Sequence, residues 1–545
     1  MAGRTAAAAV AALAIITAAC STDAAVSEST SRPVDAADEP AEAQAAPETA
    51  DTGPADEPAE PVDGSEGESS GDEPVESDGQ TDTPTADAFV PDELDWDDYD
   101  SSVEVALLDV PVDYDDPDGA TFEIFVARHR AGNPDERIGS LLVNPGGPGF
   151  GGSDLAIFAA QIYDPRLLEH FDIVGWDPRG TGLSEPPIDC IDDFDPYFTA
   201  VDSTPETDEE RLEMVGIAED FAAACTGRNG TIIEHVGTNN SARDMDTLRR
   251  ALGEEQISYF GFSYGSELGA TWATLFPDTV RAAVLDGASD PNADALESSL
   301  QQMRGFQESL ETFLSRCDDI PDCEFRQGGD ATEAYLDLMA DLDAMPLEID
   351  PDRPPVNRDV ATVATIQAMY SENLWQQLER ALANAIDGDG SGLMRLNDQY
   401  YQRQPDGTYG NELEAFQTIS CADTADRQTV EEADAEAPLY REVAPLLIPE
   451  GSTGSYFCTF FPPALDPRAD VTGVGAGPIV VIGTTGDPAT PFDSTVRMSD
   501  TLEDGRLVIV EADQHTGYGV NLCVVEVVNR YLIDLEPPDD GTECA

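Results

Sequence analysis

The stretch ISYFGFSYGSELGATWATLFP, residues 257–277, constrains the fold of this chain more than any other. Residues 257–260 combine β-branched and aromatic side chains and predict a short buried strand, whereas residues 267–276 are apolar at helical spacing and end before Pro277. Ser263 stands on the tight turn between them, with glycine two residues away on each side. Such glycines let strand and helix pack closely, so the turn would present the serine hydroxyl at the carboxyl end of a sheet.

A glycine-rich loop precedes this turn, in the stretch GSLLVNPGGPGFGGSD of residues 139–154. Residues 140–143 predict a strand leading into the loop. Backbone N–H groups left free by such a loop can surround an oxyanion, where each is worth about 3–4 kcal/mol. No Gly-Lys-Ser/Thr follows, which excludes a phosphate-binding loop. A further buried strand begins at Phe171, and for Arg179 in the turn after it we expect a structural role.

A nucleophilic serine needs a general base, and the chain contains four histidines. His515 lies in a short loop after the predicted strand of residues 507–510. This is the edge of the sheet where the last member of a Ser-Asp-His triad belongs. We expect His129, His170 and His235 to be surface or capping residues.

The imidazole in turn needs a carboxylate to orient it. Asp487 follows the core strand predicted in GPIVVIGTTGDPATPF, residues 477–492, and lies between the serine and the histidine in the chain. The order serine, aspartate, histidine is that of the α/β-hydrolases. Asp286, after the strand VRAAVLDG, remains an alternative, as does Asp513, although Asp513 is very near His515 in sequence.

These stretches resemble the secreted actinobacterial tripeptidyl aminopeptidases, relatives of the prolyl aminopeptidases within the α/β-hydrolase fold. The resemblance runs from about residue 100 to the C-terminus, where the region is similar to the tripeptidyl aminopeptidase C-terminal part. It rests on NPGGPG, FDIVGWDPRGTGLSEP, ARDMDTLRRALG, GFSYGSELGATWATLFPDTVRAAVLDGASDP, TISCAD and GTTGDPATPF.

The resemblance implies that Ser263 is the nucleophile and that Asp487 and His515 complete the triad. The backbone N–H groups of Gly147 and Tyr264 would form the oxyanion hole. It implies a serine exopeptidase that cleaves peptides from their free N-terminus. Because a triad does not distinguish ester from amide, an esterase or lipase on the same fold stays open, as does a surface binding protein without chemistry.

Glu267 departs from the family pattern, which usually has an uncharged residue at this position. A carboxylate there could bind the ammonium group of a substrate, or it could be buried with a partner of its own.

The pattern of elements predicts an α/β-hydrolase core, with a mostly parallel sheet flanked by helices, formed by residues 96–293 and 418–545. Between these parts, residues 294–417 contain long helix-like segments and predict a helical cap insertion. Such a cap would cover the carboxyl edge of the sheet and narrow the access to Ser263.

The N-terminal segment predicts export. Arg4, the apolar residues 6–19 and Cys20 form a lipoprotein-type signal peptide, residues 1–20, in which Cys20 would be lipidated. Residues 21–95 are acidic and almost free of large apolar side chains, so we expect a disordered linker. We expect a cell-envelope lipoprotein or a secreted protein that touches the membrane only through this lipid.

Charge and cysteine content narrow the partners further. The net charge is −83, and such a chain is not expected to bind nucleic acid; it fits a high-salt habitat and a high-GC genome equally well. No sequence feature indicates an oligomeric state.

Cys20 aside, an even number of cysteines remains, which predicts disulfides in an exported chain. No C-x-x-C motif occurs and no histidine stands at ligand spacing, so we expect neither a metal nor a cofactor. The cysteines allow roughly a hundred pairings, and the sequence alone does not choose among them. The simplest joins them in chain order, as Cys190 with Cys225, Cys317 with Cys323, Cys421 with Cys458, and Cys523 with Cys544.

Overall fold

The computed structural model describes residues 89–326 and 328–545. The predicted signal peptide with Cys20 and most of the predicted linker lie outside the described residues. Among the helices that are described, none has both the length and the hydropathy needed to cross a bilayer.

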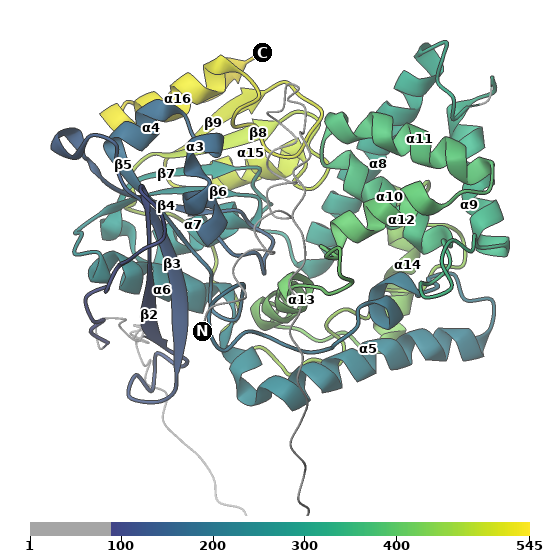
Figure 1. Cartoon of the computed structure of the whole chain (residues 1–545), viewed down its shortest axis with the longest axis horizontal. Coiled ribbons are helices and arrows are strands. Elements are labelled where there is room, and N and C mark those ends of the chain that lie inside the picture. The colour runs from purple at the N-terminus through teal and green to yellow at the C-terminus, as the bar shows by residue number, and fades with distance from the viewer. Residues whose placement is uncertain (1–88, 327) are drawn as a thin grey trace, which may run out of the picture. The chain divides into compact units, whose positions relative to one another are not determined.

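The strands of the described residues form one sheet, in the order β1-β2-β3-β5-β4-β6-β7-β8-β9-β10 (Figure 1). The pairs β1–β2, β2–β3 and β3–β5 are antiparallel, and every later pair is parallel. The expected mostly parallel sheet is therefore confirmed. The bounds of the strands are β1 (Asp97–Asp98), β2 (Val103–Pro111), β3 (Thr121–His129), β4 (Gly139–Asn144), β5 (Phe171–Trp176), β6 (Ile257–Phe262), β7 (Val280–Asp286), β8 (Ile479–Thr484), β9 (Gly505–Val510) and β10 (Thr542–Cys544).

The central strands are buried on both faces, which is why their sequences are nearly continuous apolar runs. In β4, for example, Leu142 packs on one face with Tyr259 of β6, whereas Leu141 packs on the other with Phe260. Helices cover both faces. On the face of Leu142 lie α6 (Thr238–Ala251), α7 (Tyr264–Leu275) and α15 (Phe492–Thr501), and on the face of Leu141 lie α2 (Ser153–Ile157), α3 (Ala159–Ile162), α4 (Pro165–His170) and α16 (Leu522–Asp534).

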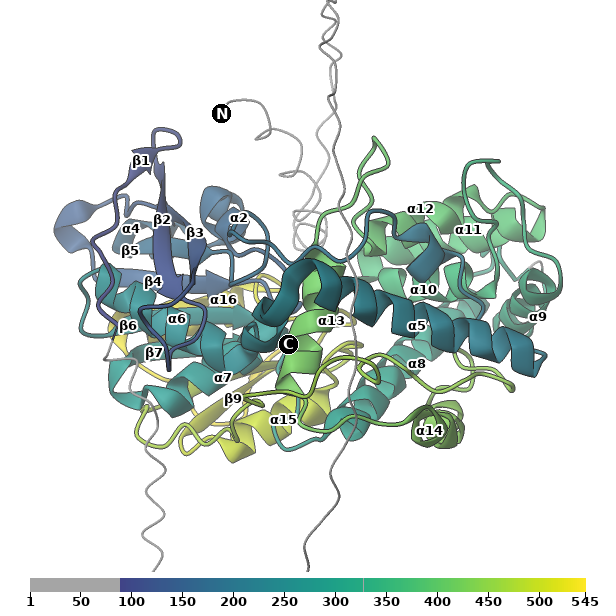
Figure 2. The same cartoon turned by 90° about the horizontal axis from the view of Figure 1, so that it is seen from below.

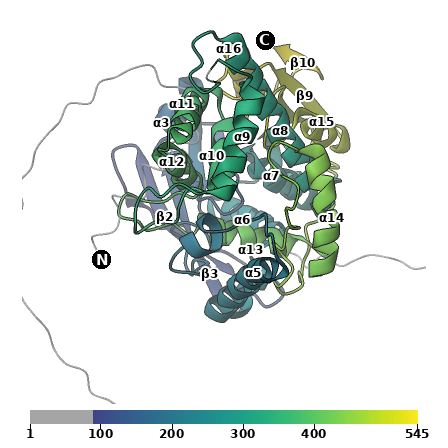
Figure 3. The same cartoon turned by 90° about the vertical axis from the view of Figure 1, so that its right-hand side faces the viewer.

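Between β7 and β8 the chain forms a helical region with a core of its own, to which Leu310, Tyr335, Met339 and Leu382 contribute. Figure 3 shows α8 to α12 gathered in front of the sheet. Helical structure continues past residue 417, as far as Val443. The helices are α8 (Ala295–Asp319), α9 (Ala331–Ala344), α10 (Arg358–Met369), α11 (Trp375–Ile386), α12 (Ser391–Tyr400), α13 (Glu412–Asp423) and α14 (Val430–Val443).

A second segment joins this helical region from the first half of the chain. The segment between β5 and α6, which includes α5 (Asp208–Asn229), extends alongside α13 towards α14 (Figure 2). Ser203 bonds to Asp359 of α10, with its Oγ 2.5 Å from Oδ1, and Arg211 of α5 forms an ion pair with Asp434 of α14. The cap is thus assembled from two parts of the chain that are distant in sequence.

The described cysteines are joined in chain order, which is the simplest of the pairings that the sequence allowed. The pairs are Cys190–Cys225, Cys317–Cys323, Cys421–Cys458 and Cys523–Cys544. Disulfides of this number are typical of proteins that fold in an oxidising compartment.

Arg179, in the turn after β5, is fully buried and braces the core. Its Nε and Nη2 atoms donate to the two carboxylate oxygens of Asp244, over 2.7 and 2.6 Å. The remaining N–H groups donate to backbone carbonyls of Pro111, Val112 and His235. The guanidinium therefore ties the end of β2 to α6 and to the loop before it.

We expect Arg179→Ala to lower the free energy of unfolding by about 3–5 kcal/mol, because it leaves the buried Asp244 carboxylate without a counter-charge. Urea unfolding measures this loss. The control is Arg530→Ala, since Arg530 and Glu536 form an exposed pair at 3.9 Å, worth less than about 1 kcal/mol. Equal losses in the two variants would contradict the role of Arg179 as a buried brace.

Candidate active site

Ser263 lies between the last residue of β6 and the first residue of α7, as the sequence predicted. Its backbone has φ 54° and ψ −127°, a region that residues with side chains rarely adopt. Its N–H donates to the carbonyl of Asp286 over 2.8 Å, and its carbonyl accepts from the N–H of Ser266 over 2.8 Å. These bonds on both sides hold the serine in a strained conformation.

The two glycines that flank the turn are required by close packing. A Cβ on Gly261 would lie 2.3 Å from the carbonyl oxygen of Gly265, and a Cβ on Gly265 would lie 2.8 Å from that of Asn144. The spacing G-x-S-x-G is thus the consequence of β6, α7 and the end of β4 meeting at one point.

The glycine-rich loop after β4 lies directly against the serine. Gly146 has φ +101°, and a Cβ there would lie 2.5 Å from the carbonyl oxygen of Phe262 and 2.8 Å from the Cβ of Ser263. Among the described residues, the backbone N–H groups of Gly147 and Tyr264 donate to no acceptor. Tyr264 begins α7, and the first amides of a helix have no acceptor within it. Both amides are therefore available to an oxyanion.

His515 is bonded to Asp487. Its Nδ1 lies 2.9 Å from each carboxylate oxygen of Asp487, and Asp487 is only 4% exposed. The same carboxylate accepts backbone N–H groups from Ala489, Thr490 and Thr516, over 3.0, 2.8 and 3.0 Å. The aspartate thus fixes the imidazole ring through its Nδ1 atom.

The other ring nitrogen, Nε2, is buried and has no hydrogen-bond partner among the described residues. The ring of Tyr370, from the cap, packs edge-on against the imidazole with ring centroids 5.6 Å apart. Burial lowers the pKa of His515, but the charge and hydrogen bond of Asp487, with a smaller contribution from Asp286, outweigh it and raise the pKa above 6.5. The surroundings therefore favour the imidazolium form.

The two rival carboxylates have other partners. The oxygens of Asp286 accept the backbone N–H groups of Gly517 and Tyr518, over 2.8 and 2.7 Å. Asp513 forms an ion pair with Arg316 of α8. Of the three candidates, Asp487 is the one hydrogen-bonded to the histidine.

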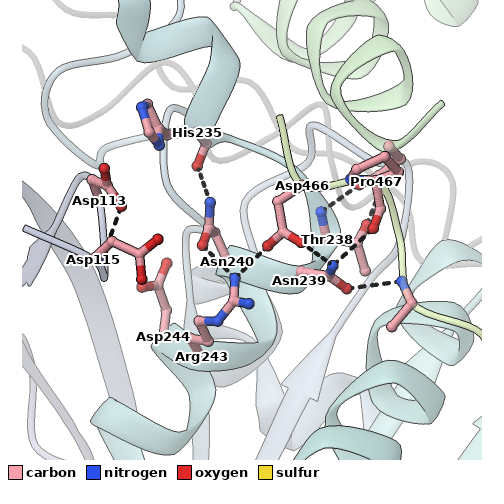
Figure 4. Close-up of polar contacts among 12 residues, drawn as sticks. Asp113, Asp115, His235, Thr238, Asn239, Asn240, Arg243, Asp244, Asp466 and Pro467 are labelled. Carbon is pink, nitrogen blue, oxygen red and sulfur yellow. Dashed lines mark hydrogen bonds and ion pairs between the residues drawn. The ribbon is translucent and has the colours of Figure 1, made fainter. Parts of the chain in front are cut away.

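The other histidines lie elsewhere in the fold. His129 is the last residue of β3, and His170 is the last residue of α4, with its Nδ1 3.3 Å from the carbonyl of Glu136. His235 ends a 3-10 helix before α6, and its carbonyl accepts from the side chain of Asn240 (Figure 4).

Glu267, one turn after Ser263 in α7, has partners of its own. It forms an ion pair with Arg468 and accepts a hydrogen bond from Ser289 Oγ over 2.8 Å. Sequence reasoning missed Arg468, which lies far from Glu267 in the chain and has no motif around it.

Arg468 is held by a segment that is fastened to the start of α6 (Figure 4). Asn239 Nδ2 donates to a carboxylate oxygen of Asp466 and to the carbonyl of Pro467, both over 2.9 Å. Arg243 donates to the other Asp466 oxygen over 2.6 Å. These contacts place the guanidinium beside Glu267.

Asp423 is a second carboxylate near this turn, and sequence reasoning missed its role. It accepts from the N–H and the hydroxyl of Thr238, over 2.6 and 2.5 Å, and Thr238 in turn bonds to the hydroxyl of Tyr264. Burial, with a further contribution from Glu267, raises the pKa of Asp423 to about 7. The stretch TISCAD, in which Asp423 is the last residue, was the available signal.

No three His, Cys, Asp or Glu side chains in the described part of the chain are grouped as a metal site requires. A strained serine on a strand-to-helix turn with a glycine loop against it, in a chain that also holds a histidine bonded to an aspartate, is typical of serine hydrolases. Residues 139–522 match the family model described as the alpha/beta hydrolase fold. The chain belongs to the α/β-hydrolase family.

Similar proteins include hydrolases with different names. Serine protease Hip1 of Mycobacterium tuberculosis is 37% identical, over 80% of this chain and 86% of its own length. Carboxylesterase B of the same species is 36% identical, over 81% of this chain and 86% of its own length. Tripeptidyl aminopeptidase of Streptomyces lividans is 27% identical, over 83% of this chain and 86% of its own length.

We expect Gly146→Ala to slow the reaction of the chain with a fluorophosphonate probe by at least about 10²-fold, because its Cβ would displace the loop or the serine. Gel fluorescence against time measures the labelling rate. Gly227→Ala, in α5, is the matched control, since a Cβ there meets nothing within 4 Å. Labelling of Gly146→Ala at the wild-type rate would contradict the close contact.

Proposed function

We propose that the chain is an exported serine exopeptidase that removes short peptides or single residues from the free N-terminus of peptides. Ser263 is the nucleophile, His515 the general base and Asp487 the residue that orients it. The observation that carries this proposal is the strained turn at Ser263, with the glycine loop against it and the Asp487–His515 pair at the ends of neighbouring strands.

In this mechanism Ser263 Oγ attacks the scissile carbonyl carbon while His515 Nε2 takes the hydroxyl proton. The N–H groups of Gly147 and Tyr264 stabilise the oxyanion. The imidazolium then gives its proton to the leaving amine, the C–N bond breaks and an acyl-enzyme remains. Water, deprotonated by His515, hydrolyses the acyl-enzyme and restores the serine.

The pH dependence follows from the environment of His515. The histidine must be neutral to take the proton, and its pKa is raised above 6.5 by Asp487, against the opposing effect of burial. Activity therefore falls as the pH drops through this raised pKa.

Peptide substrates are supported by the relatives named serine protease and tripeptidyl aminopeptidase. Esterase action is a second candidate, and the observation that favours it is the equally similar relative named Carboxylesterase B. Export is supported by the four disulfides and by the N-terminal sequence pattern.

Cleavage from a free N-terminus is supported by the charge balance beside the serine. Glu267 forms an ion pair with Arg468, and Asp423, which bonds to Thr238, is close enough for its charge to act on the same guanidinium. A desolvated ammonium group needs a carboxylate partner, because an unpaired buried charge costs several kcal/mol. A substrate ammonium near this group would favour the ionised form of Asp423, whose pKa burial otherwise raises to about 7.

We expect the fluorophosphonate probe to label the wild-type chain and not Ser263→Ala, which should also lose peptide turnover by several orders of magnitude. Ser298→Ala, at an exposed serine of α8, is the control for folding and should still be labelled. Equal labelling of wild type and Ser263→Ala would refute the assignment of the nucleophile.

We expect chromogenic peptide amides with a free amine to be cleaved much faster than their N-acetylated forms and than short-chain esters. Glu267→Gln should raise KM for the free-amine peptides by about tenfold, which corresponds to about 1.4 kcal/mol, and should leave the acetylated peptides unchanged. Steady-state kinetics on the three substrate types measures both effects.

The control for the substrate assay is Asp426→Asn, at an exposed carboxylate near the end of α13. Equal cleavage of blocked and free peptides would mean an endopeptidase, and turnover of esters alone would assign the chain to the esterases.

A further inference from the structure

The loop that carries His515 is held by two carboxylates through consecutive residues. The carboxylate of Asp487 is hydrogen-bonded to Nδ1 of His515 and accepts the N–H of Thr516. The carboxylate of Asp286 accepts the next two N–H groups, those of Gly517 and Tyr518, one on each oxygen. Thr516 is the last of these residues to bond to Asp487, and the residues after it bond to Asp286. Its φ is +68°.

Asp286 also contacts the nucleophile through its backbone. It is the last residue of β7, and its carbonyl accepts the N–H of Ser263 over 2.8 Å. The following residue, Gly287, has φ +68°, and a Cβ there would lie 3.2 Å from Cε1 of His515. One residue therefore bonds both to the serine turn and to the histidine loop.

The carboxylate of Asp286 forms no ion pair with an arginine of the described residues. The side chain is fully buried, and its hydrogen-bond partners among the described residues are the two backbone N–H groups. An amide side chain of the same shape has one oxygen and one NH₂ group, so it can accept only one of these N–H groups and would face the other with a donor. The pair of bonds to consecutive N–H groups thus requires a carboxylate.

We propose that Asp286 is a positioning residue for the reaction, which holds the His515 loop against the Ser263 turn. This inference rests on the proposed function, since it assigns a role relative to Ser263 and His515. Asp286 does not touch the reacting atoms, and it acts through the histidine and the serine.

The charge of Asp286 predicts a change in the pH profile of the reaction, which a residue that only fills space in the core would not cause. Asp286 contributes to the raised pKa of His515, after the larger effects of burial and Asp487. Burial raises the pKa of Asp286 itself to about 7, so its negative charge is fully present only above that pH. The other charged or titratable groups around the site are Tyr370 from the cap, Tyr518, and the ion pair of Asp513 with Arg316. These side chains are all kept when Asp286 becomes asparagine, so a shift of the pH profile reports the lost charge.

The test is Asp286→Asn in the full chain, with kcat, KM, the fluorophosphonate labelling rate and the pH profile as readouts. We expect kcat and the labelling rate to fall by about 10- to 100-fold while KM changes little, because the histidine is misplaced relative to the serine. We also expect the acid limb of kcat/KM to move to lower pH, because the imidazolium loses a nearby negative charge.

Glu414→Gln is the matched control. Glu414 is also buried, and its carboxylate also accepts two consecutive backbone N–H groups, those of Cys190 and Ile191, over 3.2 and 2.7 Å. The two substitutions remove the same kind of bond, but Glu414 bonds to no residue of the candidate active site. Glu414→Gln should therefore lower the thermal midpoint as Asp286→Asn does, with kcat and the pH profile unchanged.

Wild-type kcat and an unshifted acid limb in Asp286→Asn would overturn the proposal, as would equal kinetic losses in Glu414→Gln. If Asp286→Asn does not fold, Asp286→Ala with added formate replaces it, and recovery of kcat by formate supports the role. Failure of both variants to fold would make Asp286 a folding determinant and would also overturn the proposal. Ser263→Ala in the same assay tests the proposed function separately, because labelling of that variant would refute the nucleophile whatever Asp286 does.

Discussion

The parallel pairing of β6, β7, β8 and β9 is the constraint on which the rest of the structure depends. The ladder sets Phe262 opposite Asp286, Asp286 opposite Ile482, and Thr484 opposite Val510, so these strands end at one edge of the sheet. Because neighbouring strands lie about 5 Å apart, the short turns that follow them bring their first residues into contact. Ser263 and the loops of Asp487 and His515 converge for this reason, and Asp286 lies between them.

The pairing of buried carboxylates is a second constraint on the structure. The chain has a net charge of −83 and 27 basic residues, all of them arginine, so arginine is the side chain that pairs with these carboxylates. The planar guanidinium can make several bonds at once. Arg179 bonds to a carboxylate and three carbonyls in the core, and Arg468 forms an ion pair with Glu267, one turn after the serine. The buried carboxylates of Asp286 and Glu414 instead each accept hydrogen bonds from two consecutive backbone N–H groups.

The helical region between β7 and β8 is packed separately from the sheet. Its helices have their own apolar core. The segment with α5, which precedes Ser263 in the chain, bonds to these helices through Ser203 and Arg211. At the boundary with the catalytic edge, α13 packs on the glycine loop, where a Cβ on Gly149 would lie 2.3 Å from the carbonyl of Glu412. Tyr370 reaches from the cap to His515. The helical region between β7 and β8 therefore contacts two parts of the candidate site.

The sequence by itself determined the strand, turn and helix of residues 257–277 and the order of serine, aspartate and histidine, because periodicity and glycine spacing are local properties. Only the tertiary structure decided that Asp487 rather than Asp286 or Asp513 bonds to the histidine, that Arg468 pairs with Glu267, and that the α5 segment joins the cap. Each of these depends on contacts between side chains far apart in the chain. A local pattern does not record such contacts, because they arise only when the sheet has brought the strand ends together.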